Sequence, residues 1–324
     1  MVNVFITIDT ELYPRTPDWE KNQLAEEIER FIYGVTPGGE FGIRYQSQML
    51  ARYGLKAVFF VESLFACAAG GAPLREIVRC IGEGGHDVEL HLHAEWLRWI
   101  VDPALPKRAG NNIRDFTVEE QAALIEKAVM NLEASSGKRP CAFRAGNYGA
   151  NRDTLKALAR NGMRFDTSYN PSYLKSSCGL AMDMLMTEPQ RVEGIWEMPI
   201  MVFEDWPGHL RHLQLCACSW LEIQDCLMWA WRNNVESIVL VSHSFEMLKR
   251  PIRCDVPSSV NRVVVRRFEQ LCRFLALHRD KFNTIGYADL SDTWVPRSVG
   301  PHLHRSSLWK TAHRYLEQGV ATYV

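Results

Sequence analysis

Several features that would place a chain in a common class are missing from this sequence of 324 residues. It has no run of about 18 apolar residues, which a membrane-spanning helix requires, and no dense stretch of lysine and arginine like those on nucleic-acid surfaces. The first residues, MVNVFITIDTEL, lack a basic segment followed by a cleavable apolar stretch. With a net charge of -1 as well, we expect a cytoplasmic protein with no membrane span and no nucleic-acid partner. Its oligomeric state stays open.

Cysteine pairs at metal-binding or redox spacing are also absent. The nine cysteines include no CxxC pair, and their odd number is typical of free, mostly buried thiols in a reducing compartment. Hydrophobic residues make up 47% of the chain and charged residues 23%, which is the balance of a globular protein that can bury a core. Ten tryptophans are more than a core needs, and sugar-binding clefts often stack rings on indoles.

Short apolar runs that alternate with helical patterns are the main structural signal. This alternation is typical of βαβ units with a parallel sheet. Seven such runs are fewer than the eight strands of a closed TIM barrel, so we predict an α/β fold of the distorted or partly open (β/α)7 barrel type. The runs cover residues 2–9, 55–62, 87–93, 141–146, 194–202, 237–243 and 282–290.

Helix ends and long connections complete the predicted barrel over residues 1–297. Thr117 and Glu120 form a capping box before one helix, Gly137 follows its far end, and another helix runs from near Asn151 to Gly162. Two loop insertions are expected at 13–45, with one possible helix in LAEEIERFIYG, and at 94–116, and long loops in barrels tend to shape the active site. Residues 298–324 are predicted to form a C-terminal helical tail.

The first strand ends in TIDTE, which places two carboxylates two residues apart. In extended geometry Asp9 and Glu11 project to the same side. Like charges at that distance repel, so keeping both ionised requires a cation or a shared proton. The alternative is a solvated strand end with a helix cap.

The third strand carries further candidate metal ligands in DVELHLHAEW. Glu89, His91 and His93 share one face by the period of two, and Glu95 comes just past the strand end. Imidazole and carboxylate suit zinc or a similar divalent ion, and a catalytic site keeps one coordination position open for water. The alternative is that one of the histidines is merely packed.

Three more strand ends carry polar groups where barrel enzymes place catalytic residues. Arg144 lies in FRAGNYG, His243 in LVSHSFE and, as a weaker case, Asp166 in FDTSYNP. A lone arginine or histidine is more often structural, and only the shared strand-end positions favour a catalytic role.

Taken in order, TIDTE, GHDVELHLH, FRAGNYG, FDTSY, EMP and LVSH resemble the successive motifs of the NodB-homology polysaccharide deacetylases of carbohydrate esterase family 4. The resemblance spans about residues 2–290 and indicates a divergent branch. It implies that Asp9 and Glu11 supply a catalytic base and a metal-binding carboxylate, that His91 is a metal ligand, and that Arg144 and His243 are the catalytic arginine and acid.

The chain departs from the family pattern at two places. The usual adjacent pair of aspartates is replaced by Asp9 and Glu11 on either side of Thr10, so either carboxylate is a candidate ligand. The second histidine usually follows four residues after the first, but that position holds Glu95, which is itself a candidate ligand. We prefer His93 because it shares a strand face with His91.

These patterns together favour a metal-dependent hydrolase that removes an N-acetyl or related acyl group from a sugar, a glycan precursor or a sugar nucleotide. One divalent ion is expected, zinc before cobalt, nickel or manganese. Substrate contacts are expected from Glu95, Trp96, Tyr148 and Asp166. The alternatives are another metallohydrolase, since HxH also begins other metal sites, a glycosidase with Asp9 and Glu95 as its carboxylates, or an inactive glycan-binding barrel.

Overall fold

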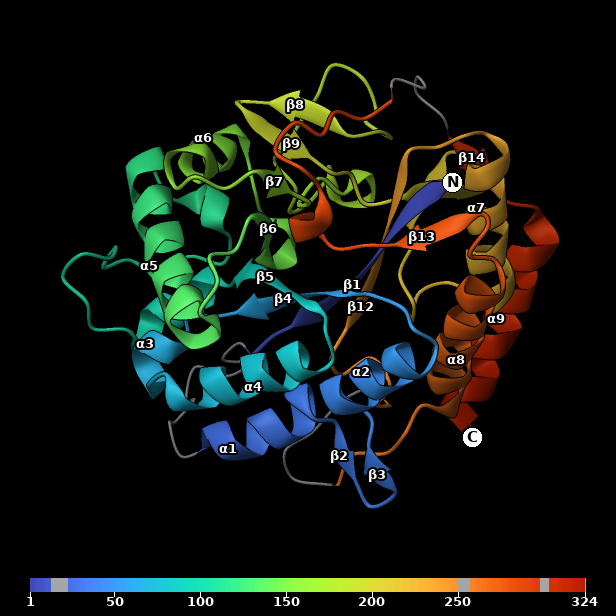
Figure 1. The fold of residues 1–324 in the computed structure, drawn as a ribbon, viewed down its shortest axis with the longest axis horizontal. Helices are drawn as coiled ribbons and strands as arrows, with labels where there is room; N and C mark the ends of the chain where they lie inside the picture. Colours follow the sequence, from blue (N-terminus) through green and yellow to red (C-terminus); the bar gives the residue numbers. More distant parts are fainter. Residues whose placement is uncertain (13–22, 250–256, 298–302, 324) are drawn as a thin grey trace.

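The computed structural model describes residues 1–12, 23–249, 257–297 and 303–323, and its centre is one large curled sheet (Figure 1). The strands of this sheet follow the order β12, β1, β4, β5, β6, β7, β9, β8, and β13 pairs with β1 beside this path. Their bounds are β1 (Val2–Thr10), β4 (Val58–Glu62), β5 (Asp87–Leu92), β6 (Ala142–Ala145), β7 (Phe165–Asp166), β8 (Gln190–Val192), β9 (Ile195–Glu197), β12 (Ser237–His243) and β13 (Phe282–Thr284).

The sheet is a barrel that stays partly open. Pairing is parallel from β12 to β9, and only the edge strand β8 runs antiparallel to its neighbour. The described path ends at β12 and β8, and the segment 213–215 lies against β12, with Leu215 N donating to Val241 O at 2.9 Å. The predicted α/β fold with a partly open barrel is therefore confirmed.

Each of the seven predicted apolar runs contains a strand of this sheet, but the run 194–202 was predicted as one strand and is two. Strand β9 ends at Glu197, Pro199 has no N–H to continue the ladder, and the next strand, β10 (Val202–Trp206), belongs to another sheet. Two strands of this sheet were not predicted. Strand β7 has only two residues, and β8 is a mostly exposed hairpin arm joined to β9 by a turn with positive φ at Glu193 and Gly194.

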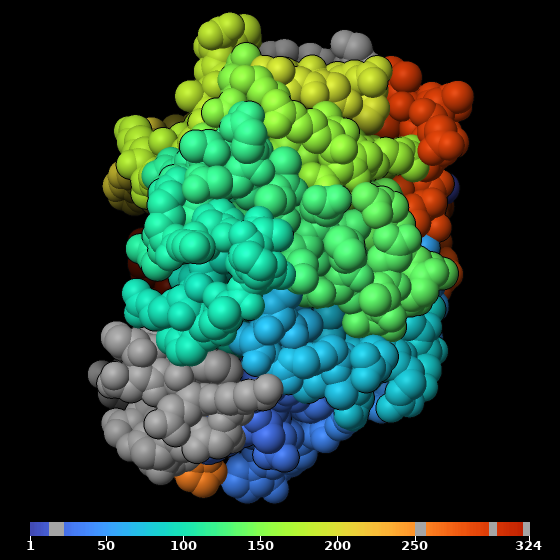
Figure 2. Space-filling model, turned by 90° about the vertical axis from the view of Figure 1, so that its left-hand side faces the viewer, coloured from blue at the N-terminus to red at the C-terminus, as the bar shows by residue number. Residues whose placement is uncertain are grey.

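Helices follow the strands in chain order and pack side by side around the outside of the sheet. On the face shown in Figure 2 the colours run in sequence order from blue to yellow, as successive βα units winding round a barrel produce. The predicted capping box is confirmed, because Glu120 Oε2 accepts from Thr117 N at 2.8 Å and Thr117 Oγ1 accepts from Glu120 N at 3.3 Å. The main helices are α2 (Ile43–Arg52), α4 (Ala72–Glu83), α5 (Val118–Ser136), α6 (Arg152–Arg160), α7 (Trp220–Arg232), α8 (Arg262–Leu277) and α9 (Leu308–Tyr323).

The segments predicted as insertions contain short elements of their own. Residues 13–22 lie outside the described residues. The helix predicted in LAEEIERFIYG is present as α1 (Leu24–Glu27) continued by the π-helical turn η2 (Ile28–Ile32). Residues 94–116 contain the 3₁₀ turns η3 (Ala94–Trp99) and η4 (Ile113–Asp115).

The last helix, α9, packs against α7, α8 and β10 (Val202–Trp206), beside α8 in Figure 1. Arg314 of α9 is fully buried, and its guanidinium donates to Asp205 at 2.7 Å and to Glu222 at 2.6 Å. Breaking such a buried pair is costly, so this contact ties the helix to the rest of the protein. The division into residues 1–297 and 298–324 stays a prediction. None of the described helices is long and apolar enough to cross a bilayer.

Candidate metal centre and active site

The predicted functional residues meet at the carboxyl edge of the sheet, because parallel strands end at the same side. Asp9 near the end of β1 lies opposite His243 at the end of β12. His91 of β5 lies opposite Arg144 of β6. Glu11 follows β1 directly. The structure therefore brings together residues from four strand ends that are up to 234 positions apart in the chain.

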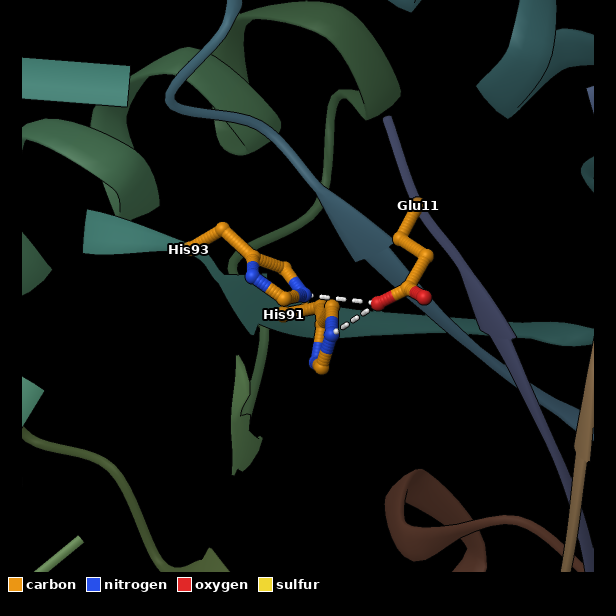
Figure 3. A group of neighbouring side chains, drawn as sticks. All are labelled: Glu11, His91 and His93. Carbon is orange, nitrogen blue, oxygen red and sulfur yellow. Dashed lines mark hydrogen bonds and ion pairs between the residues drawn. The ribbon is translucent and has the colours of Figure 1, made fainter. Parts of the chain in front are cut away.

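Glu11, His91 and His93 form a buried group whose side chains point toward one another (Figure 3). Glu11 Oε2 lies 3.0 Å from His91 Nε2 and 2.6 Å from His93 Nε2. One donor atom from each residue falls within 4.8 Å of the others, and one carboxylate with two imidazoles is a donor set that suits a zinc-like ion.

A contact with the backbone of Arg144 fixes the orientation of the His91 ring. Its Nδ1 lies 2.9 Å from the carbonyl oxygen of Arg144, and this contact turns Nε2 toward Glu11 Oε2 at 3.0 Å. Metal-bound histidines usually have their second nitrogen held in this way. This donor chemistry and orientation fit a divalent cation.

The charges in this group depend on one another. Burial by itself would raise the pKa of Glu11, but the charge of His93 and hydrogen bonds from His91 and His93 hold it well below its usual range. Burial by itself would lower the pKa of His93, but the carboxylates of Glu11 and Glu95 raise it well above its usual value. A positive charge is therefore favoured between these groups, and a proton or a metal ion can supply it.

Glu89, expected to face the same way as His91 and His93, does not join this group. Its carboxylate accepts from the backbone N–H of Cys141 at 2.7 Å and of Ala142 at 2.8 Å, nearer the start of the barrel strands. Burial raises its pKa to about 7. Glu89 and His93 are four positions apart, and the backbones of such residues on a strand lie about 13 Å apart, which is too far for both side chains to bind one ion.

Asp9 is held by Arg144 rather than by the Glu11–His91–His93 group. Arg144 Nη1 donates to Asp9 Oδ1 at 2.6 Å and to Thr7 Oγ1 at 2.9 Å, and its Nε donates to the carbonyl of Thr167 at 3.3 Å. The arginine is fully buried and its guanidinium lies over the ring of Phe60. This network holds the Asp9 carboxylate in one orientation.

His243 faces the other oxygen of this aspartate, with its Nε2 3.8 Å from Asp9 Oδ2. Its Nδ1 donates to Glu246 Oε1 at 2.8 Å, and the second oxygen of Glu246 accepts from Cys216 N at 3.1 Å. Burial by itself would lower the pKa of His243, but the hydrogen bond and charge of Glu246 raise it to about 9. The imidazole therefore carries a proton at neutral pH.

Glu246 and Gln214 belong to this site but were not predicted from the sequence. Gln214 Nε2 donates to Glu246 Oε1, and its Oε1 lies 2.5 Å from His212 Nε2. A carboxylate three residues after His243 was a visible signal for Glu246, since a turn brings such residues together. Nothing in the sequence around Gln214 indicated its place.

An open cleft of about 450 Å³ joins these groups, within the size range of small-molecule sites. The 94–116 segment contributes two asparagines to its wall. Tyr148 lies where substrate contact was predicted, and its buried hydroxyl has no hydrogen-bond partner. The lining residues are Asp9, Glu11, His91, His93, Asn111, Asn112, Ala145, Asn147, Tyr148, Tyr173, Ser176, Ser177, Gln214 and His243.

Three residues predicted to contact substrate do not line this cleft. Trp96 is fully buried, and its indole N–H donates to the carbonyl of Leu12 at 2.7 Å. Asp166 is also fully buried and accepts from Ser168 Oγ at 2.7 Å. Glu95 is mostly buried, and both of its carboxylate oxygens have partners within the protein. Each prediction rested on position after a strand, which does not tell which way the side chain turns.

No protein-family model and no curated protein matches the chain. Among solved structures, one described as a polysaccharide deacetylase from Mycobacterium smegmatis is similar, with 15% identity, a TM-score of 0.54 and coverage of 89% of this chain and 87% of that one. The 4-alpha-glucanotransferase from Thermococcus litoralis has 13% identity, a TM-score of 0.55 and coverage of 91% and 41%. A family 4 carbohydrate esterase from Streptomyces lividans has 12% identity, a TM-score of 0.41 and coverage of 87% and 91%.

The chain therefore has the NodB, carbohydrate esterase family 4 type of fold, as the sequence motifs led us to expect. At these identities the likeness concerns the fold alone. A glucanotransferase shares much of the same fold, so the chemistry has to be argued from the residues in the cleft.

Proposed function

We propose that this protein is a metal-dependent hydrolase that removes an N-acetyl or related acyl group from a sugar. The observation that carries the proposal is the meeting in one cleft of a Glu11–His91–His93 group, an aspartate held by a buried arginine, and a protonated histidine. Hydrolysis of an unactivated amide needs a base, an acid and stabilisation of a developing oxyanion. Asp9 and His243 are the candidate base and acid, and a metal ion held by Glu11, His91 and His93 would stabilise the oxyanion.

Glu11, His91 and His93 are the residues that would hold the metal ion. A divalent ion bound there would act as a Lewis acid toward an acyl oxygen and would lower the pKa of a nearby water. Of the two carboxylates after the first strand, we assign Glu11 to the metal because its oxygen faces both imidazoles, whereas Asp9 faces Arg144 and His243.

Asp9 is the proposed general base. The guanidinium of Arg144 donates to Oδ1 and holds the carboxylate in one orientation, and Oδ2 is turned toward the side of the cleft where His243 lies. In this position Asp9 accepts a proton from the water that attacks the acyl carbon. Arg144 does not touch the substrate in this scheme and acts by positioning Asp9.

His243 is the proposed general acid. Glu246 holds its Nδ1, so that Nε2 carries the proton that faces the cleft. Collapse of the tetrahedral intermediate expels an amine, which is a poor leaving group until it is protonated. Proton transfer from His243 Nε2 lets a free amino sugar and a carboxylic acid leave.

The test is to compare Asp9→Asn with His91→Ala for metal content and for release of acetate from N-acetylated sugars. Asp9→Asn should keep about one ion per chain and lose most turnover, and general-base loss typically costs about 100-fold or more. His91→Ala should lose the ion itself. Equal metal content in the two variants would contradict the assignment in which Glu11 and His91 bind the metal and Asp9 does not.

A glycosidase is the rival that the fold leaves open, because a 4-alpha-glucanotransferase is among the similar structures. Its two carboxylates would be Asp9 and Glu95. Glu95 is a poor general acid here because His93 and Asn147 bind its two oxygens, and their hydrogen bonds outweigh burial and lower its pKa. Cleavage of a glycosidic bond by metal-free protein, with no acetate released, would favour that rival.

A further inference from the structure

The position that holds a histidine in the deacetylase pattern holds Glu95 in this chain, and its side chain lies behind the metal-binding group. Glu95 Oε2 accepts from His93 Nδ1 at 3.2 Å, and Glu95 Oε1 accepts from Asn147 Nδ2 at 3.0 Å. His93 Nε2, on the other side of the same ring, faces Glu11 Oε2 at 2.6 Å. Successive contacts therefore link Glu11 to His93, His93 to Glu95, and Glu95 to Asn147.

The turn η5 (Gly146–Tyr148) holds this arrangement from the side. A Cβ atom at Gly146 would lie 2.7 Å from His93 Nδ1, so only glycine lets the backbone approach the imidazole this closely. The next residue, Asn147, has a φ of 57°, in the left-handed region that asparagine tolerates better than most residues. The same amide that donates to Glu95 also donates to the carbonyl of Asn111 at 3.3 Å.

We propose that Glu95 is a positioning residue that fixes the ring and the tautomer of His93 for metal binding, and that Asn147 holds Glu95 in place. The proposal rests on the proposed function in assigning a metal ion to Glu11, His91 and His93. A carboxylate on Nδ1 keeps a proton on that nitrogen, so that the Nε2 lone pair can bind a cation, and it makes Nε2 more basic. It also removes the rotational freedom of the ring before the ion arrives.

This assignment explains how a chain without the usual second histidine position keeps a complete donor set. His93, two residues after His91, takes the place at the metal, and Glu95, four residues after His91, supports it from the outer side. Glu95 lies at Nδ1 of His93 and is not part of the group of converging donor atoms found among the described residues. The departure from the family pattern is thus a rearrangement of roles.

The links to Asn147 also connect the metal centre with the substrate cleft. Asn147 directly precedes Tyr148, and both line the cleft with left-handed backbone conformations. An ion held by Glu11 and His93 would be linked to the wall of the cleft through Glu95 and Asn147. We therefore predict that metal affinity depends on Asn147, although Asn147 contacts neither the ion nor any of its three proposed ligands.

The test measures zinc affinity by competition with a chromophoric chelator for wild type, Glu95→Gln, Asn147→Gly and the control Glu119→Gln. Glu119 is an exposed glutamate on α5, so its variant should bind zinc as wild type does. Glu95→Gln should still bind one ion, but about 10- to 100-fold more weakly. Asn147→Gly removes the amide and keeps the left-handed backbone, and it should weaken binding by a smaller factor in the same direction.

Thermal unfolding separates this role from a general loss of stability. The metal-free Asn147→Gly and Glu95→Gln proteins should unfold within a few degrees of metal-free wild type, while the increase in Tm on adding zinc should be smaller in both. If Glu95→Gln does not fold, Asn147→Gly tests the same carboxylate without changing it. If Glu95 and Asn147 only stabilised the fold, each variant would have a lower Tm by the same amount with and without zinc.

The outcomes distinguish this proposal from the proposed function. If wild type binds no zinc, the metal-dependent function is wrong. If wild type binds zinc and both Glu95→Gln and Asn147→Gly bind it equally well, the proposed function stands and the role of Glu95 is refuted. If Glu95→Gln loses the ion while His93→Ala keeps it, Glu95 is itself the ligand and the positioning role is also refuted.

Discussion

Replacing Glu246 with glutamine should turn His243 from a group that is mostly protonated at physiological pH into one that is mostly neutral. In the wild type, burial by itself would lower the pKa of His243, and the Glu246 carboxylate, 2.8 Å from its Nδ1, raises it to about 9. Glutamine keeps the size of the side chain and removes its charge. Without that charge the pKa should fall to about 6.5 or below, because burial then dominates.

The size of the effect follows from these values. At pH 7.5 a group with a pKa of about 9 is about 97% protonated, and one with a pKa of about 6.5 is about 9% protonated. The variant should therefore lose about tenfold in kcat/KM at pH 7.5 and recover most of it near pH 5.5. Both the loss and the recovery report the protonated fraction of His243.

The assay is the pH profile of kcat/KM for an N-acetylated sugar amide, with Glu83→Gln as the control. Glu83 is an exposed glutamate on α4 paired with Arg79, and its removal should leave the profile unchanged. A loss in Glu246→Gln that is the same at every pH would refute the argument, since it would indicate displacement of His243 rather than a change in its protonation.

Three further predictions concern the buried groups around the cleft. Arg144→Met should destabilise the protein by about 3–5 kcal/mol in chemical denaturation, because it leaves the buried Asp9 carboxylate without its nearest cation, and a loss below about 1 kcal/mol would contradict this. Burial raises the pKa values of Asp166 and its neighbour Glu197, so these two groups bind more protons in the folded protein than in the unfolded chain above about pH 4, and their contribution to the unfolding free energy falls as pH rises. Asp166→Asn should therefore gain stability relative to wild type as pH rises from about 4 to 7 in chemical denaturation, and a stability difference that does not change with pH would contradict this. Trp96→Phe should cost about 1–3 kcal/mol by removing the hydrogen bond to Leu12, with an unchanged KM, whereas a raised KM would restore Trp96 as a substrate contact.

Helix ends and strand periodicity were predictable because they depend on near neighbours in the chain. Thr117 and Glu120 satisfy each other's backbone N–H groups within one turn, whatever the rest of the protein does. The period of two placed His91 and His93 on one side, and both do face Glu11. The carboxyl ends of parallel strands meet at one edge, so Asp9, Arg144 and His243 could be expected to meet as well.

Sequence alone thus determined the type of fold, the edge of the sheet where chemistry could occur, and the residue types gathered there. It did not determine the partner of each polar group. Whether Glu95 binds a metal or a histidine, whether Trp96 lies in the cleft or below it, and which residue holds His243 all depend on side-chain directions after the strand ends. Those directions are set by contacts with distant segments, such as Asn147 with Glu95, and only the tertiary structure brings these segments together.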